Sequence, residues 1–376
     1  MAVFESLYFY ASYIVPFIFV LSIVVFFHEL GHFMVGRWCG VKVDVFSLGF
    51  GPEVFSFHDS KGTKWRLAAL PLGGFVKFHG DSNAASMSDA EMQATMPPEE
   101  RAVSFFAQKV WKRAAVVAAG PIANFLLAIV IFTLVYFSFG REVLAPRVNE
   151  VKAGEAAAAA GFETGDLIVS IDGDEIGSWS EMQRVVQKSA GVPLTFVIRR
   201  GVKELTLTAV PAQRDLNTPF GKQRMGMLGL TAAADPADWR IEHYSLPQAA
   251  RIAVGETWFI VERTISYVGG VFTGRETADQ ISGPIRIAEI SGQVAKVGIV
   301  ALFNLAAVLS VSVGLINLFP IPLLDGGHLL YYLVESLRGR PMSERAQELG
   351  FRVGIALVGA LMLFATFNDL LHLTRG

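Results

Sequence analysis

The chain has 376 residues, of which 52% are hydrophobic and 18% are charged, and its mean hydropathy is +0.44. This composition excludes an ordinary soluble protein and favours a polytopic membrane protein. The net charge of −2 gives no electrostatic basis for binding nucleic acid, and the single cysteine, Cys39, excludes an intramolecular disulfide.

Four segments are apolar enough, and long enough, to cross about 30 Å of hydrocarbon at about 1.5 Å per residue. They cover residues 9–36, 114–139, 297–318 and 351–372. The sequence therefore predicts a polytopic α-helical membrane protein with four transmembrane helices.

The connections between these spans differ in their basic residues, and this difference sets the orientation of the chain. No Lys or Arg precedes the first span, whereas the 37–113 connection is rich in both and the 319–350 connection carries three Arg. Both connections should be cytoplasmic, so we expect the N-terminus, residues 140–296 and the C-terminus to lie outside. Long external segments translocate largely regardless of their own charge.

The first span contains His28-Glu-Leu-Gly-His32 after a run from Tyr13 to Phe27 that has no charge. On a helix, two residues four apart lie about 40° apart around the axis, so both imidazoles can reach one metal ion. Glu29 stands beside them, where it can deprotonate a metal-activated water. The motif predicts a zinc site within the hydrocarbon layer.

Residues 54–79, between the first two spans, predict a cytoplasmic β-hairpin or small sheet. Lys64–Phe78 is typical of two short strands around a Pro-Leu-Gly-Gly turn. Its apolar content predicts that it packs on the membrane domain or dips into it.

Residues 143–232 predict a compact α+β unit outside the membrane. Ala156–Ala160 reads as a short helix that ends at Gly161, and a second helix and three strands follow. This order, and the run from Ala159 to Gly173 in particular, resembles a PDZ domain of the circularly permuted bacterial kind. Residues 233–296 follow as a connector with amphipathic helical stretches, too polar for a fifth span, and their contact with the membrane stays open.

A third metal ligand is needed, because a catalytic zinc typically takes three protein ligands and keeps one open position. A carboxylate at membrane depth is the natural candidate, since it needs a partner there. Asp325 lies at the cytoplasmic end of the third span, after a break at Pro320 and Pro322, and the two histidines approach the same end of the first span. We interpret Asp325 as the third ligand. His328 is not expected as a fourth, because it would close the position that water needs.

These motifs resemble those of the bacterial site-2 proteases, intramembrane zinc metalloproteases of the regulator-of-sigma-E-protease (RseP) type. The resemblance rests on His28-Glu-x-x-His32, Asn317-x-x-Pro-x-x-x-Leu-Asp-Gly326, Gly120-Pro-x-x-Asn124 and the single PDZ-like insert. It implies a metalloendopeptidase with one catalytic zinc, held by His28, His32 and Asp325, and with Glu29 as the general base. It also implies a multi-pass protein of the bacterial inner membrane, with its active site near the cytoplasmic side and its PDZ domain in the periplasm.

On this resemblance, the expected reaction is hydrolysis of a peptide bond within or near a transmembrane segment of a single-span membrane protein, such as an anti-sigma factor or a remnant signal peptide. An edge strand of the hairpin would hold the unwound substrate by strand addition. The PDZ domain would gate access, as a size filter or by binding a peptide C-terminus. The hairpin candidates for substrate binding are Leu70, Gly73, Gly74, Phe75 and Val76.

Some interpretations stay open. Asn124 and Asn317 either bind the substrate or its developing oxyanion, or they join helices within the lipid. A membrane chaperone that binds helices without cutting them is a second class, although all four catalytic positions are intact. A metal transporter is a third, but a general base on a helix and a PDZ-like domain have no obvious purpose there.

Overall fold

The computed structural model describes residues 2–80, 96–218, 221–232, 235–274, 278 and 282–375. The chain divides into two compact units. The first comprises Met1–Val135, Ala249–Glu262 and Ile281–Gly376, and the second comprises Tyr136–Gln248 and Arg263–Gln280.

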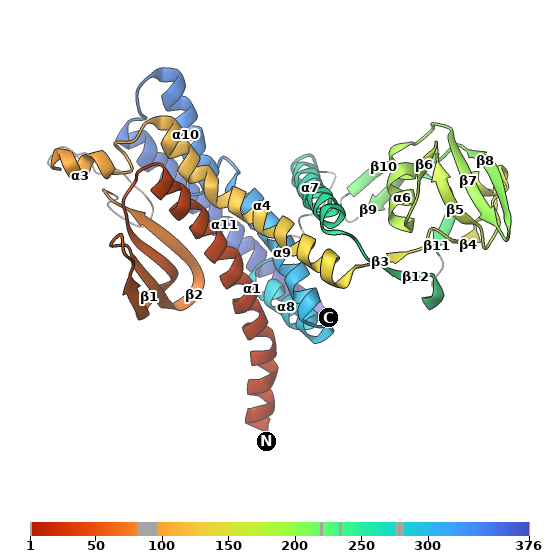
Figure 1. Cartoon of the computed structure of the whole chain (residues 1–376), viewed down its shortest axis with the longest axis horizontal. Coiled ribbons are helices and arrows are strands. Elements are labelled where there is room, and N and C mark those ends of the chain that lie inside the picture. The colour runs from red at the N-terminus through yellow and green to blue at the C-terminus, as the bar shows by residue number, and fades with distance from the viewer. Residues whose placement is uncertain are drawn as a thin grey trace. The chain divides into compact units, whose positions relative to one another are not determined.

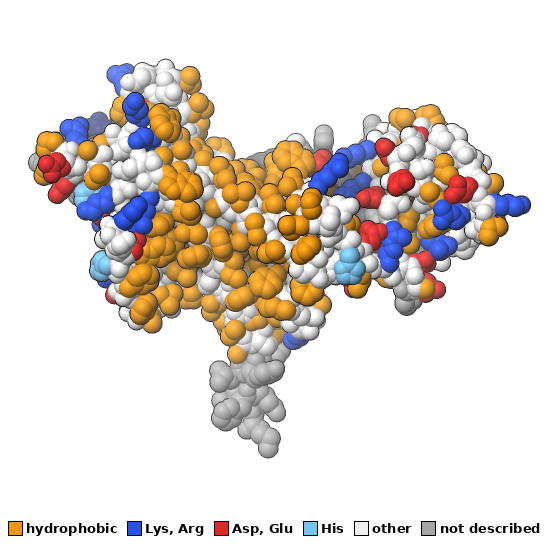
Figure 2. All heavy atoms as spheres, viewed as in Figure 1, with side chains coloured by type: hydrophobic (Ala, Val, Ile, Leu, Met, Phe, Trp, Pro, Cys, Tyr) orange, Lys and Arg blue, Asp and Glu red, His pale blue; other side chains and the backbone are white. Residues whose placement is uncertain are grey.

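Within the described residues, four helices are long and apolar enough to cross a membrane, which confirms the predicted number of spans. They are α1 (Ala2–Trp38), α4 (Val110–Phe139), α9 (Ile299–Asn317) and α11 (Glu344–Arg375) (Figure 1). Figure 2 shows hydrophobic side chains over most of the visible face of this helical body. Large apolar side chains such as Leu126 on α4 and Leu363 on α11 are exposed, as lipid contact requires. The protein is therefore a polytopic helical membrane protein.

The chain turns sharply after α9. The helix ends at Asn317, and the short helix α10 (Asp325–Arg338) begins at Asp325. Gly326 packs so closely against the carbonyl oxygens of Leu318 and Phe319 that a Cβ atom would overlap them. This tight packing fixes Asp325 at the first position of α10, close below the end of α9.

A second short helix, α8 (Pro284–Val297), packs against α1, α9 and α11. The buried Asp369 of α11 accepts hydrogen bonds of 2.9–3.1 Å from the backbone N–H groups of Gly283, Ile285 and Arg286. The carboxylate thereby satisfies the free N–H groups at the start of α8, which have no partner within that helix. The polar end of α11 thus holds α8 in place.

A β-sheet lies beside α1. Its strands β1 (Val43–His58) and β2 (Lys64–Phe78) are antiparallel, and Phe46 of β1 pairs with both Val76 and Trp65 of β2. The first part of β1 therefore lies between the two parts of β2. The prediction of two short strands around a turn is wrong here, because β2 is one strand whose two parts both pair with β1. The sheet also begins at Val43 rather than near residue 54, since Val43 and Phe46 are buried in a core shared with α1 and α4.

The end of α1 is bonded to this sheet. Arg37 forms an ion pair of 2.5 Å with Asp59 and donates a hydrogen bond of 2.8 Å to Thr63, in the connection between β1 and β2. Trp65 Nε1 also donates to Asp59, at 3.0 Å. Desolvation raises the pKa of Asp59, but the hydrogen bonds from Trp65 and Arg37 outweigh it and lower that pKa to about 2. Asp59 is thus ionised at neutral pH and fixes the sheet relative to the helix that carries the histidines.

The first unit also contains the short helix α3 (Pro98–Val103). Helix α7 (Leu246–Phe272) contributes residues to both units. Parts of the predicted 233–296 connector lie outside the described residues.

The second unit is built around a four-stranded sheet in the order β6-β5-β7-β8. Its core holds Ile168, Ile171, Phe196 and Ile198, all at most 2% exposed. The predicted short helix at Ala156–Ala160 and the helix and strands after it are confirmed. The elements are β5 (Leu167–Ile171), β6 (Asp174–Glu175), β7 (Leu194–Arg200), β8 (Lys203–Ala209), α5 (Ala156–Ala160) and α6 (Trp179–Lys188).

Among its described residues, this unit also has three two-stranded ribbons. β3 (Arg141–Leu144) pairs with β12 (Trp239–Glu242), which follows a short 3-10 helix at Pro236–Asp238. β4 (Val148–Val151) pairs with β11 (Leu230–Ala232), and β9 (Ala212–Thr218) pairs with β10 (Gly221–Met227).

A buried ion pair joins the start of β5 to the end of β7. Asp166, whose side chain is fully buried, receives bonds of 2.8 and 2.9 Å from Arg200. Replacing Arg200 by Gln should destabilise the second unit by about 3 kcal/mol, because a buried charge loses its partner. Amide hydrogen exchange in β5 and β7 of the full-length protein should then accelerate about 100-fold.

The neighbouring Arg199 supplies a matched control, since its ion pair with Glu204 is about half exposed. Arg199→Gln should leave exchange in β5 and β7 within about twofold of the wild type. Equal exchange in the Arg200→Gln and Arg199→Gln proteins would contradict the stabilising role of the buried pair.

Candidate metal centre and active site

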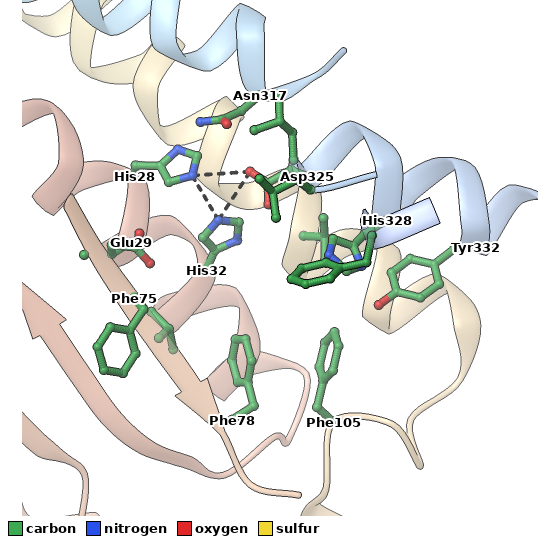
Figure 3. A pocket seen from close by; sticks show the side chains of 16 residues that line it. His28, Glu29, His32, Phe75, Phe78, Phe105, Asn317, Asp325, His328 and Tyr332 are labelled. Atoms are coloured by element: carbon green, nitrogen blue, oxygen red, sulfur yellow. Dashed lines mark hydrogen bonds and ion pairs between the residues drawn. The ribbon is translucent and has the colours of Figure 1, made fainter. Parts of the chain in front are cut away.

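His28, His32 and Asp325 each bring one ligand atom to a common point, as Figure 3 shows. The two Nε2 atoms of the histidines lie 3.3 Å apart. Asp325 Oδ2 lies 3.3 Å from His28 Nε2 and 3.5 Å from His32 Nε2. Two residues one helical turn apart on α1 thus meet the first residue of α10.

The donor set and its size fit a zinc ion. Ligand atoms at about 2.0–2.1 Å from a tetrahedral zinc are about 3.3–3.4 Å apart, close to the separations observed here. Asp325 Oδ2 is buried and accepts no hydrogen bond within the described part of the chain. Two imidazoles and one carboxylate form a usual catalytic zinc set and leave a fourth position open.

Helix α4 orients His32. The His32 Nδ1–H group donates to the backbone oxygen of Val116 at 2.9 Å. This bond selects the tautomer whose Nε2 lone pair points at the common point.

Helix α4 also orients His28. The side-chain amide of Asn124, which is completely buried, lies 3.2 Å from His28 Nδ1. The two ends of such an amide are interchangeable in assignment. With Oδ1 facing the ring, Asn124 accepts from Nδ1–H and leaves His28 Nε2 free for the metal. Asn124 therefore lies behind His28 and does not line the cavity.

Two glycines allow the helices to approach so closely. A Cβ atom on Gly120 of α4 would overlap His32 Nε2 and would lie 2.9 Å from His28 Cε1. A Cβ atom on Gly31 of α1 would overlap the backbone oxygen of Ala119. Gly120 thus provides the room for both imidazoles, and Asn124 follows one turn later to orient one of them.

Glu29 faces strand β2 rather than α4. Gly74 is so close that a Cβ atom there would lie 2.9 Å from Glu29 Cγ. One face of α1 thus carries the histidines, and the adjacent face carries the carboxylate.

A cavity of about 240 Å³ opens at this point. The three ligands, Glu29, part of β2, the start of α10 and aromatic side chains surround it (Figure 3). Its further lining residues are Gly74, Phe75, Val76, Phe78, Phe105, Val117, Asn317, Leu323, Leu324, His328, Tyr332 and Phe351.

The predicted substrate-binding residues divide into two groups. Asn317, Gly74, Phe75 and Val76 line the cavity, and His328 lies beside Asp325 on its wall. Leu70 and Gly73 do not line it: Leu70 is 55% exposed, and Gly73 packs against the ring of Phe50.

Sequence reasoning missed several lining residues. Tyr332 had a usable signal, because it follows Asp325 by seven residues and so shares its face of α10. Phe105 and Phe351 had none, since their approach depends on how distant segments pack. The Val116 carbonyl is a backbone group, and no side-chain pattern indicates it.

Comparison with known proteins shows the family of the chain. The model for peptidase family M50 matches residues 16–361. A protein of Agrobacterium fabrum named as a zinc metalloprotease is 48% identical over 96% of both chains. Metalloprotease MmpA of Caulobacter vibrioides is 41% identical over 95% of both chains. The regulator of sigma-E protease RseP of Salmonella typhimurium is 31% identical over 94% of this chain and 97% of its own.

Among solved structures, the PDZ domain of the SdrC-like protein from Listeria monocytogenes is 23% identical. It covers 23% of this chain and 85% of its own, with a TM-score of 0.20, which is too low to carry an argument.

Replacing Gly120 by Ala should weaken zinc binding at least about 100-fold, because the new methyl group would lie 2.2 Å from His32 Nε2 and overlap it. Zinc affinity of the purified protein, measured by competition with a chelator, checks this. Gly359→Ala on α11 is the control, since a Cβ atom there meets nothing within 4 Å. Zinc binding by Gly120→Ala equal to that of the control would contradict the packing argument.

Replacing Asn124 by Ala should weaken zinc binding by about 10–100-fold, because His28 loses the group that fixes its tautomer. The same chelator competition measures it. Asn304→Ala provides a matched control, since the Asn304 Oδ1 atom is also buried on a membrane helix but lies outside the cavity lining. If both variants bound zinc like the wild type, Asn124 would serve only to join helices.

Proposed function

The chain belongs to peptidase family M50 and is a zinc-dependent metalloprotease of the inner membrane, and we propose that it hydrolyses peptide bonds within or near transmembrane segments of other membrane proteins. One observation carries the proposal: the three ligands and Glu29 gather on and beside a charge-free span of α1. The substrates we propose are single-span proteins, such as an anti-sigma factor or a remnant signal peptide.

The proposed roles of the residues follow from their positions. His28, His32 and Asp325 hold the zinc. When bound, zinc lowers the pKa of water towards about 7 and polarises the scissile carbonyl. Glu29 takes the proton of the attacking water and returns it to the leaving amine. Asn317, on the cavity wall, donates its amide hydrogen to the oxygen of the carbonyl under attack.

The substrate must be unwound before it is cut, because a helix keeps its peptide bonds in internal hydrogen bonds. The second part of β2, which holds Gly74, Phe75 and Val76, pairs with the first part of β1 on one side and borders the cavity on the other. We propose that the unwound segment adds to this side of β2 as a further strand. Such pairing would lay the substrate backbone next to Glu29.

The proposal also covers the orientation of the chain in the membrane and the role of the second unit. The distribution of Lys and Arg supports our proposal of an active site near the cytoplasmic side and of a periplasmic location for residues 143–232. We propose that these residues form a PDZ-type domain that gates access of substrates. A groove of about 180 Å³ between α6 and residues 226–230 supports binding of a peptide C-terminus, since Trp179, Met182 and Val186 give it an apolar wall.

The decisive test replaces Glu29 by Gln. Purified full-length protein in detergent is incubated with a tagged single-span substrate, and the cut is mapped by mass spectrometry. The wild type should cut within or near the membrane segment, and Glu29→Gln should be slower by at least about 100-fold while it retains zinc. The exposed Glu348, on α11, provides the control variant Glu348→Gln, which should cut normally.

Equal cleavage by the wild type and Glu29→Gln would sink the proposed mechanism. A wild-type cut far from the membrane segment would sink the proposed substrate class and leave the metalloprotease assignment intact.

A further inference from the structure

Asp325 is the only ligand of the proposed zinc site that does not lie on α1. It is the first residue of α10, a helix of 14 residues, and it follows an irregular segment that contains two prolines. Its distance from the two histidines therefore depends on where α10 lies relative to α1 and α4. Some contact must set the position and rotation of α10.

A nearly buried ion pair makes such a contact. Arg113 Nη2, on the first turn of α4, lies 2.6 Å from Glu335 Oε1 on α10. The two side chains are 10% and 13% exposed. Arg113 Nε also donates to the backbone oxygen of Gln108 at 3.1 Å, and its guanidinium lies over the ring of Tyr332, 4.9 Å from the centroid. Arg113 thus binds two consecutive turns of α10 and is itself held by its own chain.

The same helix that binds α10 also orients the histidines. Arg113 precedes Val116, which accepts the bond from His32, by less than one turn of α4, and Asn124 lies further along this helix. Tyr332, under the guanidinium, lines the cavity on the face of α10 that begins with Asp325. Helix α4 therefore bonds to both histidine rings, and through the Arg113–Glu335 pair it also binds the helix that carries Asp325.

We propose that Arg113 and Glu335 are positioning residues for the metal centre, which hold α10 so that Asp325 completes the zinc site. The inference rests on the proposed role of His28, His32 and Asp325. Arg113 and Glu335 touch neither zinc nor substrate, and they act only through the placement of Asp325. Their loss should weaken zinc binding and change the KM for the substrate little.

The experiment measures zinc affinity of the full-length protein in detergent, by competition between the protein and a chelator for Zn²⁺ alone. Arg113→Gln and Glu335→Gln should each weaken zinc binding about tenfold. The double variant should be no weaker than the weaker single variant, because the two residues act as one pair. At saturating zinc, both single variants should recover most of their kcat, with KM within about twofold of the wild type.

Two controls separate positioning from general stability. Arg200→Gln removes a buried ion pair of the second unit, and it should lower the melting temperature of the zinc-free protein without changing zinc affinity. Arg352→Gln removes an exposed pair on α11 and should change neither quantity. If Arg113→Gln cannot be isolated, Arg113→Lys replaces it, because it keeps the charge but loses the two-sided guanidinium contact.

Wild-type zinc affinity in the Arg113 and Glu335 variants would overturn the inference, as would additive losses in the double variant. Asp325→Asn tests the premise in the same assay. If Asp325→Asn also bound zinc like the wild type, the proposed metal site itself would fail. If Asp325→Asn lost zinc while the Arg113 and Glu335 variants kept it, only the positioning role would fail.

Discussion

The central constraint on the structure is that three buried ligand atoms, His28 Nε2, His32 Nε2 and Asp325 Oδ2, face one another. Two imidazole nitrogens and a carboxylate oxygen lie 3.3–3.5 Å apart inside an apolar helical body, and the carboxylate oxygen has no hydrogen-bond donor among the described residues. Such an arrangement is repulsive in a medium of low dielectric constant unless a proton or a metal cation joins the atoms, and a metal ion can join all three at once. A zinc ion therefore supplies catalysis and also the charge that makes this part of the fold favourable.

The rest of the first unit can be understood as the support for that arrangement. Gly31 and Gly120 bring the backbones of α1 and α4 into contact, so that the groups on α4 reach the far nitrogens of both imidazoles. The tight turn after α9 places Asp325 at a helix start. These constraints act on different segments of the chain, and each restricts the position or the orientation of one or more ligand side chains. The result is a preorganised set of ligands in a region where a misplaced charge is costly.

Much of this architecture was predictable from the sequence, for a physical reason. Long apolar runs can satisfy their backbone groups in lipid only as helices, so the four spans follow from composition and length. The spacing of His28 and His32 is a local property of one helix, and Asp325 was identified by its depth. The roles given to these residues stay predictions, although the structure brings their ligand atoms together.

The pairing of β1 and β2 was not predictable, because it depends on non-local burial of residues such as Phe46. The same holds for Asn124. The sequence left its role open between substrate binding and helix contact, and only the packing of α4 on α1 places it behind His28. Patterns along the chain report a residue's own helix or strand, whereas the identity of its neighbour across a packed interface requires the fold.

The histidines and Glu29 lie on different faces of α1 and contact different neighbours. Successive residues of a helix lie about 100° apart, so His28 and Glu29 necessarily face different neighbours. The histidines face α4, which fixes them, while Glu29 faces β2 at Gly74. The contact of Arg37 with Asp59 keeps the sheet in register with this helix. The proposed pairing of an extended substrate with β2 would place its peptide groups in the cavity that Glu29 and the three ligands share with Gly74, Phe75 and Val76, so the sheet and the catalytic helix would act on the same peptide.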